Sequence, residues 1–155
     1  MRRPAIGFVF VLLANVAIAS DWATQLRSLG FWERLASIKA TSEQSVEIQR
    51  ARVPDLVALL RDPDQSVRVT AATELAEIRA VASGAISALV QAFGQPHGEE
   101  GVEYVSAVVA FGAEALPALE TALEDDNWLV RTRACMALRK LQPKRFIGGD
   151  CKRGL

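Results

Sequence analysis

Apolar residues recur along much of the chain at spacings of three and four, which is the pattern of one helix face. In residues 53–78 this spacing predicts two helices separated by a segment that contains Pro63. Proline lacks an N–H and clashes with the preceding turn, so the first helix must end before it. Ser66, with Asp64 close by, is the expected N-cap of the second helix. The connection is short, so the two helices should lie antiparallel.

The same pattern returns 63 residues further on, in residues 116–141, without a gap. The shift pairs Pro54 with Pro117, and each proline is expected in the first turn of its helix. A degenerate copy occupies residues 85–112, so the underlying period lies in the range of helical repeats. One helix pair cannot hide its apolar face alone, whereas stacked pairs can. We therefore predict an all-α chain, a short right-handed α-solenoid of antiparallel helix pairs.

The motif that the two clear copies share is Pro-x-Leu-x3-Leu-x-Asp-x4-Val-Arg-x2-Ala-x3-Leu. It resembles the HEAT repeat, in particular the short bacterial type known as the PBS-lyase HEAT-like repeat, over residues 53–141. The resemblance implies a scaffold that binds other proteins. It also implies that Asp62 and Arg68, and likewise Asp125 and Arg131, form a structural ladder of polar contacts between loops. A charge-assisted hydrogen bond to loop N–H groups is a sufficient reason for these residues.

Residues 1–19 have the composition of a secretory signal peptide. Arg2 and Arg3 precede an uncharged apolar run from residue 5 to residue 18, and Ala17-Ile18-Ala19 is a cleavage motif. The run is shorter than a membrane-spanning helix requires. We expect export to a bacterial periplasm or the extracellular space, with no stable membrane span after cleavage. An uncleaved anchor is the alternative.

Residues 20–52 are predicted to form an N-terminal helical cap on the solenoid. Gly30 should end a first short helix, and the capping-box-like segment 41–44 should start a third. We expect Trp22, Phe31 and Trp32 to belong to the core of this cap rather than to a ligand cage.

Residues 142–155 form a basic tail beyond the last copy. The two cysteines, Cys135 and Cys151, would meet an oxidising compartment after export. The connecting chain is long enough for a disulfide that folds the tail over the end of the solenoid. The alternative is a buried structural thiol and a free thiol in the tail.

The loop of the middle copy holds the only histidine, His97, beside Glu99 and Glu100. One histidine and two glutamates in a glycine-rich loop are a weak metal signal, because a metal site needs several ligands in a fixed geometry. We expect a solvated loop, and we predict no catalytic residue, no cofactor and no metal site.

The outward side of the second helices is the expected working surface. Its predicted members, the candidate face, are Thr73, Glu77, Glu103, Ser106, Trp128, Thr132, Met136 and Lys140. Trp128 is either half-buried against the neighbouring copy or an exposed anchor for a partner. The mixed charge disfavours nucleic acid, since no basic stripe is present.

These observations favour an exported, non-enzymatic scaffold or adaptor whose partner is another protein or a peptide. Two alternatives stay open: an accessory subunit of an enzyme or lyase-type complex, and a structural protein that associates with itself.

Overall fold

The computed structural model describes residues 22–95 and 100–145, and this part of the chain contains helices and no strand. The α-helices are α1 (Trp22–Ser28), α2 (Phe31–Lys39), α3 (Val46–Leu59), α4 (Gln65–Glu77), α5 (Ile86–Ala92), α6 (Glu100–Ala110), α7 (Leu116–Ala122) and α8 (Trp128–Leu141). The short 3-10 turns η1 (Arg79–Val81), η2 (Ser83–Ala85) and η3 (Gly112–Ala115) join successive pairs.

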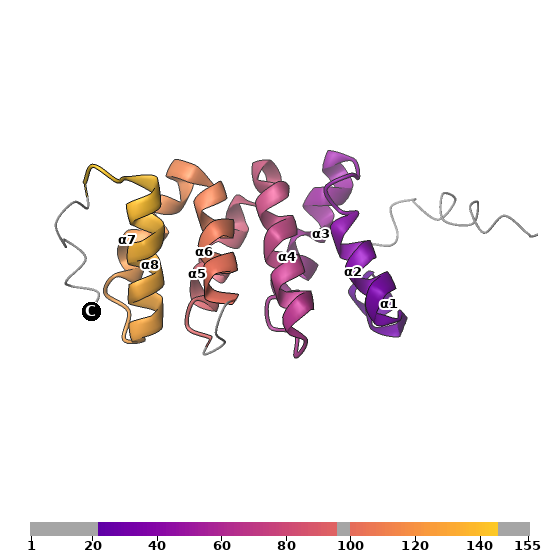
Figure 1. The fold of residues 1–155 in the computed structure, drawn as a ribbon. Helices are drawn as coiled ribbons and strands as arrows, with labels where there is room; N and C mark the ends of the chain where they lie inside the picture. Colours follow the sequence, from indigo (N-terminus) through magenta and orange to yellow (C-terminus); the bar gives the residue numbers. More distant parts are fainter. Residues whose placement is uncertain (1–21, 96–99, 146–155) are drawn as a thin grey trace, which may run out of the picture.

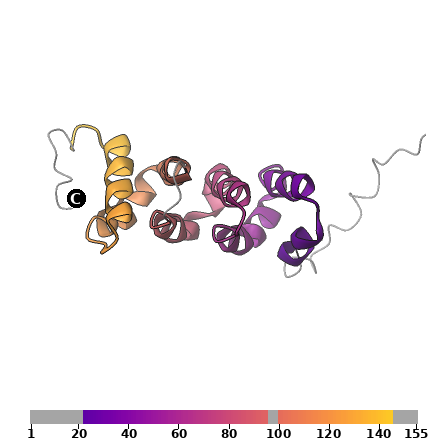
Figure 2. The ribbon, with the colours of Figure 1, turned by 60° about the horizontal axis from the view of Figure 1, so that its bottom comes forward.

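The helices stack as pairs in a row, from α1 and α2 at one end to α7 and α8 at the other (Figure 1). Turned by 60°, the row resolves into two layers (Figure 2). Helices α2, α4, α6 and α8 form one layer, in which α4 packs against both α2 and α6, and α6 packs against α8. The prediction of an all-α solenoid of helix pairs is confirmed.

The core lies between the two layers and follows the predicted apolar faces. In α4, Val67, Ala71 and Leu75 are fully buried. In α6, Tyr104 and Val105 are fully buried, whereas Glu103 and Ser106 on the opposite side are exposed. Ala71 and Ala134 have no exposed surface, so small side chains occupy the points where helices approach each other.

The boundaries of the first copy differ from the prediction. Pro54 does not begin a helix but lies inside α3, whereas Pro117 does lie in the first turn of α7. A proline in a helix interior removes one backbone hydrogen bond. The apolar stripe of α3 nevertheless continues through Val53 to the buried Leu56, and packing against α4 holds the helix together.

The predicted N-cap of α4 is also wrong. The N-cap of α4 is Asp64, whose carboxylate accepts hydrogen bonds from the backbone N–H groups of Ser66 and Val67 at 2.8 and 3.4 Å. Asp64 competes successfully because a carboxylate reaches the same free N–H groups of the first turn. Helix α1 ends at Ser28, just before Gly30, as predicted, and Gly30 itself lies in extended backbone as the N-cap residue of α2.

The start of the third helix is later than the segment 41–44 suggested. Helix α3 begins at Val46, with Ser45 before it. Thr41 is instead fully buried, and its hydroxyl accepts a hydrogen bond from Nη1 of Arg52 at 3.3 Å. The same guanidinium lies 4.6 Å from the centre of the Trp22 ring. Tertiary contacts of Thr41 therefore replace the local cap that its sequence neighbours predict.

The aromatic residues of this N-terminal unit divide into two groups. Trp22 is buried, as expected, and its indole N–H donates to Oγ of Ser37 at 3.3 Å. Phe31 and Trp32 are 39% and 77% exposed, so the prediction that they belong to the core is wrong. They are the first two residues of α2, in the helix pair at the N-terminal end of the row (Figure 1).

A buried carboxylate joins the N-terminal unit to the next pair. Oε2 of Glu74, on α4, accepts a hydrogen bond from the backbone N–H of Ser42 at 3.0 Å. Burial raises the pKa of Glu74, and the hydrogen bonds from Ser42 oppose this shift. The carboxylate gives the backbone N–H of Ser42 a hydrogen-bond acceptor, but burial disfavours the charged form of this carboxylate.

Candidate functional site

The candidate face is exposed on three neighbouring helices of one layer. Thr73 and Glu77 lie on α4, Glu103 and Ser106 on α6, and Met136 and Lys140 on α8, all with exposed side chains. Thr132, also on α8, is partly buried. Helices α4, α6 and α8 lie side by side in one layer (Figure 2). The exposed residues on them therefore belong to one side of the stack that crosses three helix pairs.

Trp128 occupies one edge of this face and is 62% exposed, so it is not half-buried against the neighbouring copy. It is the first residue of α8, directly after the N-cap Asn127. Gln65, the matching residue of the first copy, begins α4 and is exposed as well. The repeat therefore directs this position outward whichever residue fills it. Trp128, Thr132 and Met136 follow at intervals of four and make a stripe along α8.

The charge of the face changes sign along the row. Glu77 and Glu103 make the α4 and α6 part acidic, whereas the exposed Lys140 makes the α8 part basic. The face also has two exposed apolar side chains, Trp128 and Met136, the latter 41% exposed. A surface of this kind offers anchors for apolar side chains and charges of both signs.

The predicted loop arginines adopt the same geometry in both copies. Nη1 of Arg68 donates to the carbonyl oxygens of Asp62 and Pro63 at 2.7 and 2.9 Å. Nη1 of Arg131 donates to those of Asp125 and Asp126 at 2.8 Å each. These hydrogen bonds lie within one loop and not between loops. Each arginine closes the turn that precedes its own helix.

The aspartates of the same motif also organise their own loops. Oδ1 of Asp62 accepts from the backbone N–H of Asp64 at 2.9 Å, and Oδ1 of Asp125 accepts from that of Asn127 at 2.8 Å. Asp62 reaches further, since its Oδ1 lies 3.5 Å from Nη2 of Arg34 on α2. That ion pair links two units, but it joins a loop to a helix and is not the ladder between loops that the resemblance implied.

Other side chains, which the sequence did not single out, carry the hydrogen bonds between loops. Nε2 of Gln95 donates to the carbonyl of Leu60 at 3.1 Å. Nδ2 of Asn127 donates to the carbonyl of Gly94 at 3.2 Å. Nη1 of Arg133 donates to the carbonyls of Phe93 and Gln95. Arg133 is only 9% exposed, and a charged residue so deep in the stack signals a structural role.

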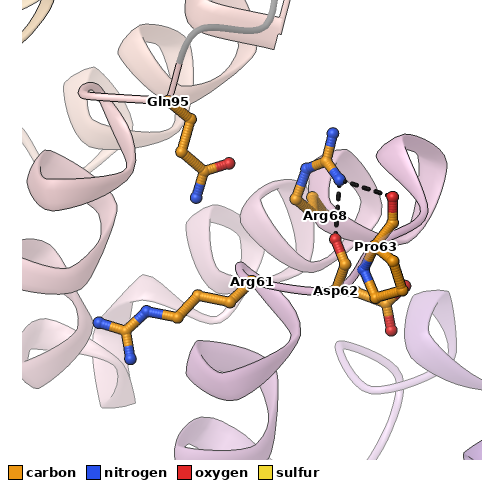
Figure 3. A pocket seen from close by; sticks show the side chains of 5 residues that line it. All are labelled: Arg61, Asp62, Pro63, Arg68 and Gln95. Atoms are coloured by element: carbon orange, nitrogen blue, oxygen red, sulfur yellow. Dashed lines mark hydrogen bonds between the residues drawn. The ribbon is translucent and has the colours of Figure 1, made fainter.

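A hollow of about 340 Å³ opens between the loops after α3 and α5. Arg61, Asp62, Pro63, Arg68 and Gln95 line it (Figure 3). Nη1 of Arg68 and Nε2 of Gln95 are already bound to backbone carbonyls, so the wall is held by the loops themselves. We read the hollow as a consequence of loop packing beside the candidate face.

Metal binding was considered for the loop that contains His97. His97 and Glu99 lie outside the described residues, as does the side chain of Glu100, so that prediction is untested. Within residues 22–95 and 100–145, no group of three or more His, Cys, Asp or Glu side chains could hold a metal ion.

The last helix carries the predicted disulfide residue Cys135, which is 8% exposed and disulfide-bonded. Cys151 lies outside the described residues, so the pairing of the two cysteines stays a prediction.

Among the described helices, none is both long and apolar enough to cross a bilayer alone. The bent pair 101–110 and 112–122 meets the criterion only on length and composition.

Compared with known protein families, residues 115–144 match the HEAT repeat. The matched segment contains α7 and α8, the pair in which Arg131 closes its own loop. No curated protein and no solved structure matches the chain. The family match does not distinguish subtypes, so the PBS-lyase type stays a prediction. The repeat match in residues 115–144 and the stacked helix pairs together support a HEAT-like helical solenoid.

Proposed function

We propose that this protein is a non-enzymatic HEAT-repeat module that binds another protein or a peptide through the outer face of α4, α6 and α8. HEAT repeats commonly mediate protein–protein interaction, and stacked repeats use such extended surfaces for binding. The observation that carries the proposal is the continuity of the exposed candidate face across three packed helices.

The composition of the face supports a protein partner. Trp128 is a large, exposed side chain of the type that dominates binding energy at interfaces. Met136 adds an adaptable apolar contact. The acidic and basic parts of the face would fix the orientation of a partner that carries the opposite arrangement of charge.

Export is part of the proposal. The n-region, apolar run and cleavage motif in residues 1–19 support secretion to the periplasm or the extracellular space. The partner would then be another exported protein. Functioning as a scaffold or adaptor would require a second partner, for which the two sides of the stack offer room.

The experiment is a pull-down from envelope extract with the wild-type chain and two variants. Trp128→Ala removes the largest exposed side chain of the face, and Ser87→Ala is the control on α5 in the other layer. We expect one protein to be retained by wild type and Ser87→Ala and lost with Trp128→Ala. Equal retention by all three chains argues against this face.

The same experiment tests the alternatives. Recovery of the chain's own copies alone would favour a self-associating structural protein. Recovery of an enzyme with changed activity would favour an accessory subunit, including one of a lyase-type complex.

A further inference from the structure

The N-terminal unit carries an exposed apolar cluster that the candidate face does not include. Leu29, Phe31 and Trp32, which we call the end cluster, are 37%, 39% and 77% exposed. They lie at the junction of α1 and α2, and the rings of Phe31 and Trp32 meet edge-on with centroids 4.9 Å apart. Three adjacent exposed apolar side chains form an apolar surface patch of the kind that marks interaction sites.

The end cluster is not needed for the packing of its own unit. Leu26 and Ile38 already fill the space between α1, α2 and the next pair, with 1% and no exposed surface. Trp22 is buried beneath the guanidinium of Arg52. The end cluster is therefore not part of the hydrophobic core, and its apolar surface is available for contact with another molecule.

The amino-acid sequence immediately before α1 indicates which surface lies near the end cluster. The uncharged apolar run of residues 5–18 ends only a few residues before Trp22. Extended chain covers at most about 3.5 Å per residue, so Ile18 and Trp22 are no more than about 14 Å apart. Helix α1 adds about 10 Å to Leu29. When the run enters a bilayer, the end cluster comes within about 25 Å of the lipid.

We propose that the end cluster docks on a lipid bilayer surface, with Trp32 and Phe31 in the headgroup region. Tryptophan favours that region because its ring is apolar and its indole N–H can form a hydrogen bond, and Phe31 adds apolar contact beside it. The exposed Arg27, two residues before Leu29, favours anionic headgroups, whereas Glu33, next to Trp32, opposes them.

This contact is peripheral and reversible, because a few side chains bind a membrane weakly without a second attachment. The apolar run supplies that attachment in the uncleaved chain, which is the alternative to signal cleavage, and the docking applies to that form. Docking would orient the stack with its N-terminal end on the membrane and leave α8 and Trp128 away from it (Figure 1). The inference goes beyond binding of a protein partner and uses different residues.

The test uses the full chain of 155 residues with mixed phosphatidylcholine–phosphatidylglycerol vesicles whose acyl chains carry bromine, a quencher of tryptophan fluorescence. Flotation reports whether the chain is bound, and quenching reports which tryptophan touches lipid. Trp32→Phe and Trp128→Phe are matched variants, since each removes one exposed tryptophan.

We expect bound wild-type chain to be quenched, Trp32→Phe to lose most of the quenching, and Trp128→Phe to keep it. Replacing phosphatidylglycerol with phosphatidylcholine should reduce the quenching. A chain that floats while Trp32 stays unquenched overturns the proposal, as does equal quenching of the two variants or a chain that does not float. A concentration-dependent change in Trp32 emission without quenching would assign the cluster to self-association and also overturn it.

Discussion

Arg133 lies directly against Gly101. A Cβ atom built on Gly101, in α6, would fall 2.2 Å from Nε of Arg133, in α8. The missing side chain of the glycine leaves the space through which the guanidinium reaches the carbonyls of Phe93 and Gln95. This contact ties the loop after α5 to the last helix pair.

Gly101→Ala should therefore destabilise the protein. Alanine favours helix by about 1 kcal/mol over glycine. The new methyl group, however, displaces a buried guanidinium from its carbonyl partners, and hydrogen bonds to charged groups are worth about 1.5–3 kcal/mol. We expect a net loss of roughly 0.5–2 kcal/mol in urea unfolding. Gly84→Ala is the control, because a Cβ there meets nothing within 4 Å and φ is not left-handed. A stabilised Gly101→Ala variant would show that Arg133 moves freely.

Glu74→Gln should raise the free energy of unfolding at neutral pH. Burial raises the pKa of Glu74, so the stability it contributes is full below its ordinary value of 4.5 and is lost as pH rises above it. Glutamine keeps an oxygen that can accept the Ser42 N–H without a buried charge. Unfolding at pH 4 and pH 7 measures the difference, which should shrink at the lower pH. Glu103→Gln, on the exposed side of α6, should change little at either pH.

Arg68→Ala should cost more stability than Arg131→Ala. Both arginines donate to two carbonyls of their own loop, but Arg68 is 7% exposed and Arg131 is only partly buried. Removing a buried charged donor leaves its partners unsatisfied, at about 1.5–3 kcal/mol for Arg68. Water can replace the Arg131 contacts at lower cost. Thermal unfolding of the two variants is the measurement, and equal losses would contradict the role of burial.

The disulfide prediction is open to a direct check. If Cys135 pairs with Cys151, the mass of the chain should rise by two hydrogens on reduction. A closed loop of this length stabilises by about 3 kcal/mol, so Cys135→Ser should lower the unfolding midpoint. An unchanged mass after reduction, or a mass of twice the chain before it, would contradict the pairing.

The amino-acid sequence predicted the helix pairs and their inward faces because those features depend on local periodicity. The buried set of α4 and the two sides of α6 follow directly from spacing. It did not predict that α3 continues through Pro54, since tertiary packing there outweighs the loss of one hydrogen bond.

The hydrogen bonds between the loops were not predicted from the amino-acid sequence. The hydrogen-bond acceptors of Gln95, Asn127 and Arg133 are backbone carbonyls more than thirty residues away. Every residue has such a carbonyl, so residue types do not indicate which one accepts the hydrogen bond. Gly101, inside α6, is a local feature that can mark a close approach, but no expectation was drawn from it. For the candidate face, spacing indicated which residues are exposed, but exposure alone does not identify a partner.

The central claim is that the outer face of α4, α6 and α8 binds a protein, and site-specific photo-crosslinking in the native envelope tests it most directly. A photoreactive amino acid would replace Thr73, Ser106 or Met136 on the face, and Ser87 or Thr121 in the other layer; all five positions are exposed. We predict one crosslinked partner of the same mass from the three face positions and none from the two controls. Crosslinks from the controls alone, or from no position, would contradict the claim.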